Sequence, residues 1–263
     1  MKKSLLILSA FIAVHAPAQS THAIKVSHAS QYEDFIEIGI EMDKPMSKFE
    51  LIGLDTMTVA SPRNSVLKEN KDYPLNYNYN NGRGFVRRYN IPDKKVKTVH
   101  ITGIISYFTP SEANGSYIDL GTLKNIQRNT NLVGKKISEK NQDLYFSIIN
   151  AEMFHKVFPD FKYKSDADKD YRKPDFESFD IMYAYRYNNK QKLLFFINDD
   201  PDPGYNNLSV RDKKTGIIYK LVRLKKNMPQ SERDQIKVEL MIENEKSVRK
   251  IPFELKDVAI QSK

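Results

Sequence analysis

The segment from Phe35 to Met42 reads FIEIGIEM and decides the fold class of this chain. Its apolar side chains recur at every second position, at Ile36, Ile38 and Ile40, with a glutamate or glycine between them. Successive side chains of a β-strand point to opposite faces, so a period of two indicates a strand with one buried face. The residues that follow have the same character over most of their length.

Strand-like segments recur along the chain, separated by turn residues. The expected strands after the first are 49–60, 73–79, 85–91, 96–107, 117–123, 144–149, 181–187, 193–197, 208–211, 217–224, 236–242 and 248–260. Asn80–Gly84 and Asp212–Gly216 offer the Asn and Gly that accept the positive φ of tight hairpins. One short helix is expected over 150–158, where Met153, Phe154 and Val157 share a helical face. Long amphipathic helices are missing from the pattern, which favours an all-β fold over an α/β fold.

The strands divide into two sets around a polar stretch at Gly134–Gln142. We therefore predict two tandem immunoglobulin-like β-sandwich domains, residues 19–139 and 140–263, because short strands at this spacing are typical of sandwiches. The segment 248–260 looks like the last strand of such a sandwich, a resemblance that concerns architecture alone. A single larger β domain is the alternative, since the polar stretch is short for a linker.

The first eighteen residues have the pattern of a signal peptide. Lys2 and Lys3 precede a short apolar core, and Ala16–Ala18 supplies the small residues at which a signal peptidase cleaves. The apolar core is shorter than the roughly 20 residues that a membrane-spanning helix needs. We therefore expect residues 1–18 to be removed and the mature chain, without a transmembrane segment, to be secreted or periplasmic.

Composition narrows the classes of function. The formal charge is +9, and loss of Lys2 and Lys3 with the signal leaves +7. The chain has no cysteine, which rules out disulfides, thiol nucleophiles and Cys-ligated zinc. It also has no tryptophan, a residue that sugar-binding platforms favour. The basic excess carries no RNP, helix-turn-helix or zinc-finger signature, so no nucleic-acid partner is expected.

A weak candidate binding surface combines aromatic and basic residues. Tyr73, Tyr77 and Tyr79 share one face of an expected strand, and Arg83 and Arg87 follow in the next turn and strand. Tyrosines in this arrangement can stack against a ligand, and arginines can bind acidic groups. The alternative is that the tyrosines form cross-strand pairs that stabilise a sheet.

Two acidic loops are weak candidates for calcium binding. Asp166, Asp168, Asp170 and Glu177 have the spacing of an EF-hand loop, but Tyr171 stands where the sharp turn requires glycine. A second loop could add further oxygen ligands from Asp199, Asp200 and Asp202. We favour solvated mixed-charge loops, with no cofactor, and keep calcium as the alternative.

Recognisable catalytic motifs are absent from the sequence. It contains no His-Glu-x-x-His or Gly-x-Ser-x-Gly arrangement, and few histidines remain after the signal. Our hypothesis is a non-enzymatic, secreted or periplasmic binding module that holds a protein or glycan through its edges and loops. The alternative is a secreted hydrolase or carbohydrate-active enzyme that uses a pair of carboxylates the sequence does not single out.

Export is directly testable on the protein from its own cells. Mass spectrometry of the extracytoplasmic fraction should find a mature N-terminus between Gln19 and Ile24, because cleavage follows the small residues at Ala16–Ala18. A cytoplasmic product that keeps Met1 would contradict export.

Overall fold

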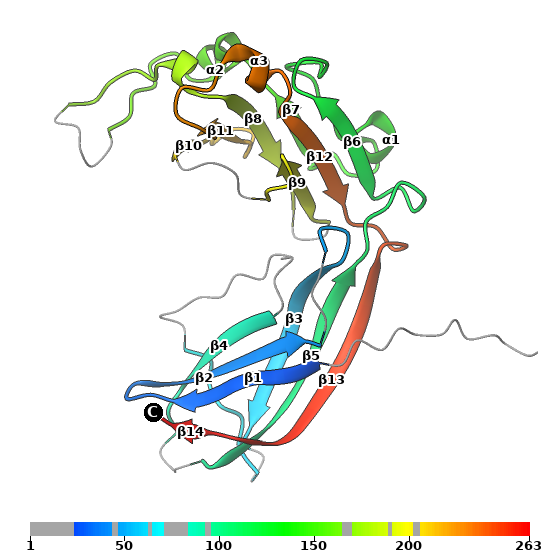
Figure 1. Cartoon of the computed structure of the whole chain (residues 1–263), viewed down its shortest axis with the longest axis vertical. Helices are drawn as coiled ribbons and strands as arrows, with labels where there is room; N and C mark the ends of the chain where they lie inside the picture. The colour runs from blue at the N-terminus through cyan, green and yellow to red at the C-terminus, as the bar shows by residue number, and fades with distance from the viewer. Residues whose placement is uncertain are drawn as a thin grey trace, which may run out of the picture.

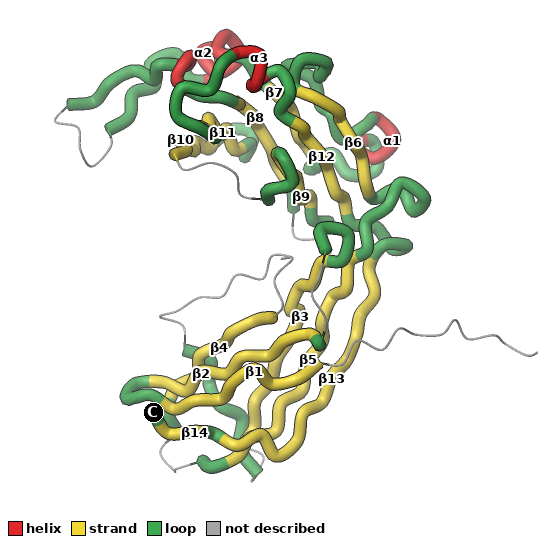
Figure 2. The backbone as a smooth tube through the Cα atoms, in the orientation of Figure 1, coloured by secondary structure: helices red, strands yellow, loops and turns green. Residues whose placement is uncertain are grey.

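The computed structural model describes residues 24–43, 47–62, 65–70, 84–92, 96–164, 170–188, 191–201 and 206–263. Strands make up about half of these residues and the helices are few and short, which confirms the all-β class (Figure 2). None of the helices in these ranges is long and apolar enough to cross a membrane. The strands form four sheets, which pack in pairs as two lobes (Figure 1).

The segment FIEIGIEM forms β2, the inner strand around which the first lobe is built. One sheet has the order β14-β1-β2-β4 and the facing sheet has the order β13-β5-β3. These strands are β1 (Ile24–Gln31), β2 (Phe35–Met42), β3 (Leu51–Ala60), β4 (Gly84–Asn90), β5 (Thr98–Phe108), β13 (Val248–Ala259) and β14 (Gln261–Ser262). The predicted alternation is confirmed, because Ile36, Ile38 and Ile40 are buried against Val59 and Ile105 of the facing sheet.

The second lobe has the same two-layer construction. Its sheets have the orders β10-β11-β8-β7 and β6-β12-β9. The strands are β6 (Tyr117–Thr122), β7 (Tyr145–Ile148), β8 (Ile181–Arg186), β9 (Leu193–Ile197), β10 (Asn206–Arg211), β11 (Ile218–Arg223) and β12 (Lys237–Ile242). Phe146 and Tyr183 of one sheet meet Val238 and Leu240 of the other in a single core.

Helices cover the end and the outer face of the second lobe. The expected helix forms α2 (Ala151–Val157), and Asn150 caps it by accepting the Met153 N–H at 2.9 Å. Phe154 of α2 packs on Tyr219 of the outer sheet face. The remaining helical turns are α1 (Lys135–Ser138), η1 (Phe176–Ser178) and α3 (Gln230–Arg233).

The chain order of the lobes differs from the predicted tandem division at residue 139. β6 lies before that position yet pairs with β12, and β13 lies after it yet pairs with β5. The second lobe is therefore inserted between β5 and β13, two neighbouring antiparallel strands of the first lobe. The polar stretch at Gly134–Gln142 contains α1 and belongs to the surface of the second lobe. A polar surface turn and a polar linker look alike in the sequence. They differ in which strands pair across them, and that pairing involves residues far away in the sequence.

The two lobes form an arch and meet through a small apolar core of their own (Figure 1). Leu51 and Phe108 of the first lobe pack against Phe196 and Met241 of the second, and all four side chains are at most 1% exposed. We call these four residues the junction core. Burial of this kind stabilises by about 25 cal/mol per Å² of apolar surface, so the contact holds the lobes together.

Substitution of a junction-core residue should loosen the arch. Phe108→Ala and Phe154→Ala each remove a fully buried ring, and each should cost about 3–5 kcal/mol of unfolding free energy. Only Phe108→Ala should broaden the interlobe distance distribution measured by small-angle scattering or paired spin labels, because Phe154 lies within the second lobe. Equal broadening in both variants would show that the junction core does not set the lobe orientation.

Candidate functional site: a charged cluster at the lobe junction

A carboxylate is buried beside the junction core, on the outer face of the sheet β6-β12-β9. β12 alternates, so Val238 and Leu240 point into the second lobe while Glu239 and Met241 point toward the first. Glu239 is 1% exposed because the first lobe covers it. A carboxylate at this depth is costly unless donors surround it.

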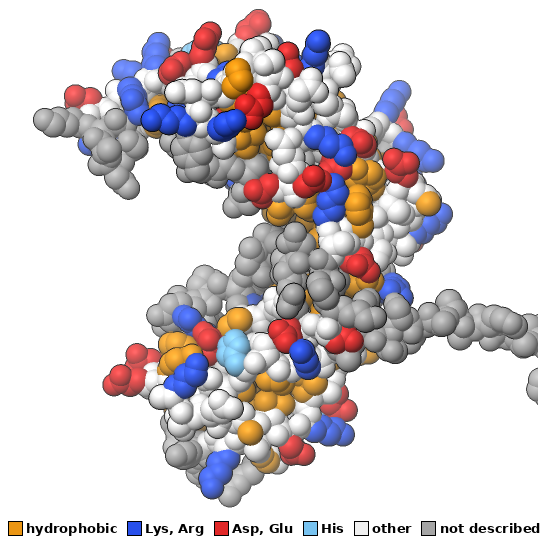
Figure 3. Space-filling model, in the orientation of Figure 1, with side chains coloured by type: hydrophobic (Ala, Val, Ile, Leu, Met, Phe, Trp, Pro, Cys, Tyr) orange, Lys and Arg blue, Asp and Glu red, His pale blue; other side chains and the backbone are white. Residues whose placement is uncertain are grey.

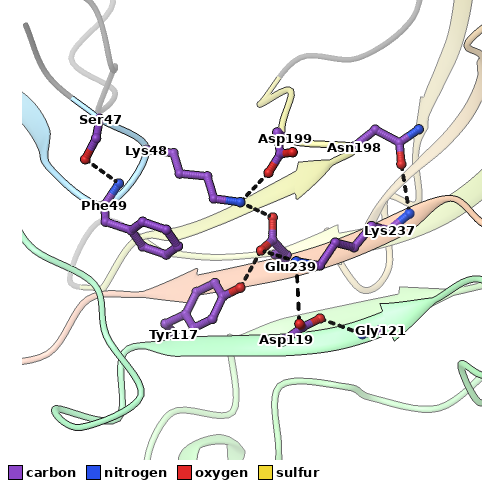
Figure 4. Close-up of polar contacts among 10 residues, drawn as sticks. All are labelled: Ser47, Lys48, Phe49, Tyr117, Asp119, Gly121, Asn198, Asp199, Lys237 and Glu239. Atoms are coloured by element: carbon purple, nitrogen blue, oxygen red, sulfur yellow. Dashed lines mark hydrogen bonds and ion pairs between the residues drawn. The ribbon is translucent and has the colours of Figure 1, made fainter.

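Three donors meet the Glu239 carboxylate (Figure 4). The Lys48 ammonium donates to Oε2 at 2.7 Å, and the Lys237 ammonium donates to Oε1 at 3.0 Å. The Tyr117 hydroxyl also donates to Oε1. The cluster therefore combines charged and neutral hydrogen bonds, the arrangement that offsets the cost of burying a carboxylate.

Lys48 is the member that joins the two lobes. It lies in the connection between β2 and β3 of the first lobe, and it also donates to Asp199 in the turn after β9. Its neighbour Phe49 packs edge-on against the Tyr117 ring, with centroids 5.2 Å apart. The connection from β2 to β3 thus places one cation and one ring against the second lobe.

The second lobe orients the remaining cation. Lys237 lies 3.5 Å from the Asp119 carboxylate, and its backbone N–H donates to the Asn198 side chain at 2.8 Å. Asp119 in turn accepts the Gly121 N–H at 2.8 Å, and Gly121 has a φ of 77°, which a larger residue would adopt only with strain. Each charged group of the cluster therefore has an opposite partner, and we call Lys48, Tyr117, Asp199, Lys237 and Glu239 the junction cluster.

The electrostatics keep these groups in one protonation state near neutral pH. Burial by itself would raise the pKa of Glu239, but hydrogen bonds from Lys48, Tyr117 and Lys237 outweigh it and hold that pKa below its ordinary value. Burial would lower the pKa of Lys48, yet Asp199 and Glu239 raise it overall. Burial and the Glu239 carboxylate both raise the pKa of Tyr117. A general acid or base needs a pKa near the working pH, so this cluster is suited to holding charges in place.

Of the residues predicted to form an aromatic and basic surface, only Arg87 lies within the described part of the chain. Arg87 is 3% exposed, because it shares the inward face of β4 with Phe85 and Tyr89, and its Nε lies 3.8 Å from Glu69. Arg87 is thus a buried cation and not a surface residue as expected. Tyr73, Tyr77, Tyr79 and Arg83 lie outside the described residues.

The structure describes half of the predicted calcium ligands. Asp170 and Glu177 are exposed, while Asp166 and Asp168, like Asp202 of the second loop, lie outside the described residues. Within the described ranges no three or more His, Asp or Glu side chains are grouped so that they could hold a metal ion. The carboxylate of Asp199 is instead directed at Lys48. Calcium binding by Asp166, Asp168, Asp170 and Glu177 stays a prediction.

His28 and His100 lie beside carboxylates on strand surfaces. His28 Nε2 is 3.2 Å from Glu37, which also accepts from Arg88 at 2.8 Å. His100 Nε2 is 3.0 Å from Glu254 across the pair β5–β13. These contacts are cross-strand polar pairs of the kind that stabilise sheets.

Ser106, Lys250 and Asp55 form a second polar group that resembles a nucleophile with its base. Lys250 donates to the Ser106 hydroxyl at 2.6 Å and also to Asp55. The Ser106 hydroxyl donates to Asp55 at 2.6 Å, and Ser106 is 2% exposed. The Lys250 ammonium is a donor and has no lone pair to take the serine proton, and the Asp55 carboxylate that accepts this proton is itself paired with Lys250. The group therefore clamps three neighbouring strands together.

A broad groove of about 1410 Å³ also lies at the junction, between the α1 region and the return crossing at 243–247. Its amides are engaged within the chain. Gln191 donates to the Glu243 carbonyl at 2.6 Å, and Asn244 donates to the Asn114 carbonyl at 3.0 Å. These two bonds fasten the return crossing to the second lobe, which gives Gln191 and Asn244 a structural role.

Sequence reasoning missed the junction cluster. One signal was present, because Glu239 is the only charge within the apolar run Val238–Ile242. A strand that is apolar on both faces is covered on both sides. A single carboxylate on such a strand is therefore buried, and it needs hydrogen-bond donors or cations around it. Nothing local identified Lys48 as the partner, since it lies in an ordinary turn 191 residues earlier.

Comparison with known proteins gives no further guide. No protein-family model, no curated protein and no solved structure matches this chain. Interpretation of the junction therefore depends on its own geometry and chemistry.

The coupling between Lys48 and Glu239 should be measurable as stability. Lys48→Met and Glu239→Gln should each lower the unfolding free energy by about 1–3 kcal/mol, because each leaves a desolvated polar group with fewer partners. In a double-mutant cycle by urea denaturation, the double variant should lose less than the sum, with a coupling of about 0.5–3 kcal/mol. Lys25→Met is the control, since the ion pair of Lys25 with Glu41 is exposed. Additive losses would show that the contact does not join the lobes energetically.

The pH dependence should follow the direction of the Glu239 pKa. A carboxylate with a depressed pKa in the folded state contributes its full stability above its unfolded pKa of about 4.3, and loses it as the pH falls below that value. The difference in unfolding free energy between the native chain and Glu239→Gln should therefore stay level from about pH 5 to pH 9 and shrink below about pH 4.5. A difference that changes around pH 7 would mean that the cluster titrates there.

Proposed function

We propose that this chain is an exported binding protein, secreted or periplasmic, built from two immunoglobulin-like β-sandwich lobes, and that it holds a protein or glycan partner without catalysing a reaction. The observation that carries this proposal is the junction cluster, in which every charge is paired and Lys48 of the first lobe meets Glu239 and Asp199 of the second. Such a cluster gives a fixed arch with two sandwich surfaces at a set orientation. A binding protein benefits from this, because preorganisation lowers the cost of ordering on association.

The strand arrangement supports the immunoglobulin-like part of the proposal. Within the described residues each lobe packs a four-stranded sheet on a three-stranded sheet. A four-plus-three sandwich of mainly antiparallel strands is the architecture of constant-type immunoglobulin domains. The insertion of the second lobe between β5 and β13 is a difference in chain order that leaves this layer arrangement intact.

The buried carboxylates favour binding over hydrolysis. Glu239 and Asp180 are the most buried carboxylates of the described residues. Asp180 lies 3.1 Å from the Arg233 guanidinium and accepts the backbone N–H groups of Leu224 and Lys225. Both carboxylates are therefore occupied by internal donors, whereas a glycosidase needs two that face its substrate.

The charge on the face shown in Figure 3 favours a specific partner over a polyanion. Basic and acidic side chains are interspersed on the face shown in Figure 3, with no large area of one sign. Polyanion binding relies on a basic patch or stripe. Protein and glycan ligands are recognised by shape and by a few directed contacts, which a mixed surface supplies.

Binding should depend on the lobe orientation. The mature chain, residues 19–263, is immobilised, the extracytoplasmic fraction of its own cells is passed over it, and the captured component is purified and titrated by calorimetry. We expect saturable binding that Phe108→Ala weakens by about tenfold, equivalent to about 1.4 kcal/mol. Phe154→Ala, which is matched in size and burial, should leave the affinity unchanged.

The enzyme alternative has a distinct outcome. The same preparation is assayed against peptide, ester and polysaccharide substrates. Turnover that disappears when one exposed carboxylate is replaced by its amide would overturn the non-enzymatic proposal. Saturable binding without turnover would support it.

A further inference from the structure

The first lobe is closed along one side of its sandwich. Residues 65–70 run from β3 to β4, where the Leu67 N–H donates to the Val59 carbonyl and the Asn70 N–H donates to the Arg88 carbonyl, both at 2.8 Å. Leu67 of this segment packs in one core cluster with Tyr89 of β4, and the two side chains are 6% and 3% exposed. This side of the lobe therefore has both its backbone edges and its core covered.

The opposite side is bounded by β1 and β13 and is only partly closed. β13 bulges after Leu255, where Asp257 has a φ of 53°, and it pairs with β5 again at Val258 and Ala259. The chain then forms β14, which pairs in parallel with Ser30 and Gln31 at one end of β1 (Figure 1). Among the described residues no strand pairs with Ile24–Ala29 on that edge.

Core side chains are partly exposed along the same stretch. Ile24 and Val26 of β1 and Ile251, Phe253 and Leu255 of β13 all pack on the core of the first lobe, yet none is fully buried. They occupy alternate positions on their strands, as residues of a sandwich interior do. An unpaired backbone edge and an incompletely covered core therefore coincide.

We propose that the edge of β1 from Ile24 to Ala29 accepts an extended segment of a protein partner, which adds a strand in line with β14. The docked segment is about six residues, or roughly 20 Å, and carries apolar side chains at alternate positions that enter between β1 and β13. Backbone hydrogen bonds supply affinity in this mode, and the pockets for alternate side chains supply specificity. This inference rests on the proposed function as a binding protein and names the partner chemistry.

Two other edge strands, β13 and β7, are less suited to an added strand. β13 has Pro252 within it and exposes Arg249, Lys250 and Lys256, features that discourage pairing at an edge. β7 is covered, because the Leu132 N–H donates to the Phe146 carbonyl at 2.7 Å. β1 contains no proline, and its outward Lys25 is paired with Glu41 at 3.0 Å.

The position of β14 argues for a partner segment and against a second copy of this chain. A docked strand must end or turn where β14 begins, next to Ser30. In a second copy, β1 continues into Gln31 at one end and is preceded by further chain at the other. In parallel pairing, Ser30 and Gln31 of the second copy would occupy the position of β14, whereas a terminal or looped partner segment can end there.

Hydrogen exchange tests the proposal on the mature chain. The probe is a short acetylated peptide that alternates threonine and valine between terminal lysines, and the matched control peptide has proline at its central valine. We expect the threonine–valine peptide to slow exchange at Ile24–Ala29 by about tenfold, and the proline peptide to have no effect. Exchange at Asn206–Arg211, the edge strand β10 of the second lobe, should not change.

Proline substitutions on the protein provide a second pair of variants. Ser27→Pro should abolish the effect of the peptide, and Ser209→Pro, at an exposed position of β10, should retain it. If Ser27→Pro fails to fold, the two peptides on the native chain still decide the question.

Three results would overturn the proposal: no slowing at Ile24–Ala29, equal slowing at β10, or protection that appears without peptide as the protein concentration rises. The last would indicate a second copy as the occupant. A natural partner that binds without slowing exchange at Ile24–Ala29 would show that this edge is not the docking site, while the proposed function as a binding protein would still be supported. Peptide binding at this edge without any natural partner would support the edge as a docking site and contradict the proposed function.

Discussion

The burial of the Glu239 carboxylate between two lobes is the constraint on which the arrangement of this molecule depends. An isolated buried carboxylate costs several kcal/mol, so the donors around it have to be present whenever the lobes are in contact. Lys237 and Tyr117 come from the second lobe itself, but Lys48 comes from the first. The favourable state of Glu239 therefore requires one particular placement of the β2–β3 connection.

The junction core strengthens this constraint. Leu51, Phe108, Phe196 and Met241 exclude water beside the cluster, and the lower local dielectric makes each charge interaction stronger. Apolar contact alone is not directional, whereas the hydrogen bonds to Glu239 are. The junction core therefore holds the lobes in contact, and the hydrogen bonds to Glu239 fix their orientation.

The inserted topology adds a covalent constraint to the non-covalent ones. The chain enters the second lobe after β5 and returns to β13, and the Thr109 N–H donates to the Ser247 carbonyl where the two crossings run side by side. Two crossings restrict relative rotation more than a single linker does. Interlobe orientation in this chain is thus set by the crossings, the junction core and the cluster, and the proposed partner binding uses surfaces that this orientation presents together.

Most of the strands could be predicted from local pattern, and the exceptions have physical reasons. β1 was not predicted, because only Ile24 and Val26 alternate with polar residues there and this short pattern lies next to the expected cleavage site. The inward position of Arg87 follows from the same alternation that buries Phe85 and Tyr89. Its charge suggested a surface position, but on a strand with fixed period the neighbours determine which face a residue occupies.

The sequence by itself determined the all-β class, the alternation that buries Ile36, Ile38 and Ile40, and the capped helix after Asn150, because each depends on residues a few positions apart. The tertiary structure alone decided which strands share a sheet, where the second lobe is inserted and that Lys48 meets Glu239. Those outcomes join residues up to 191 positions apart. Local propensity carries no information on such pairs, because their energy exists only once both lobes have folded and excluded water between them.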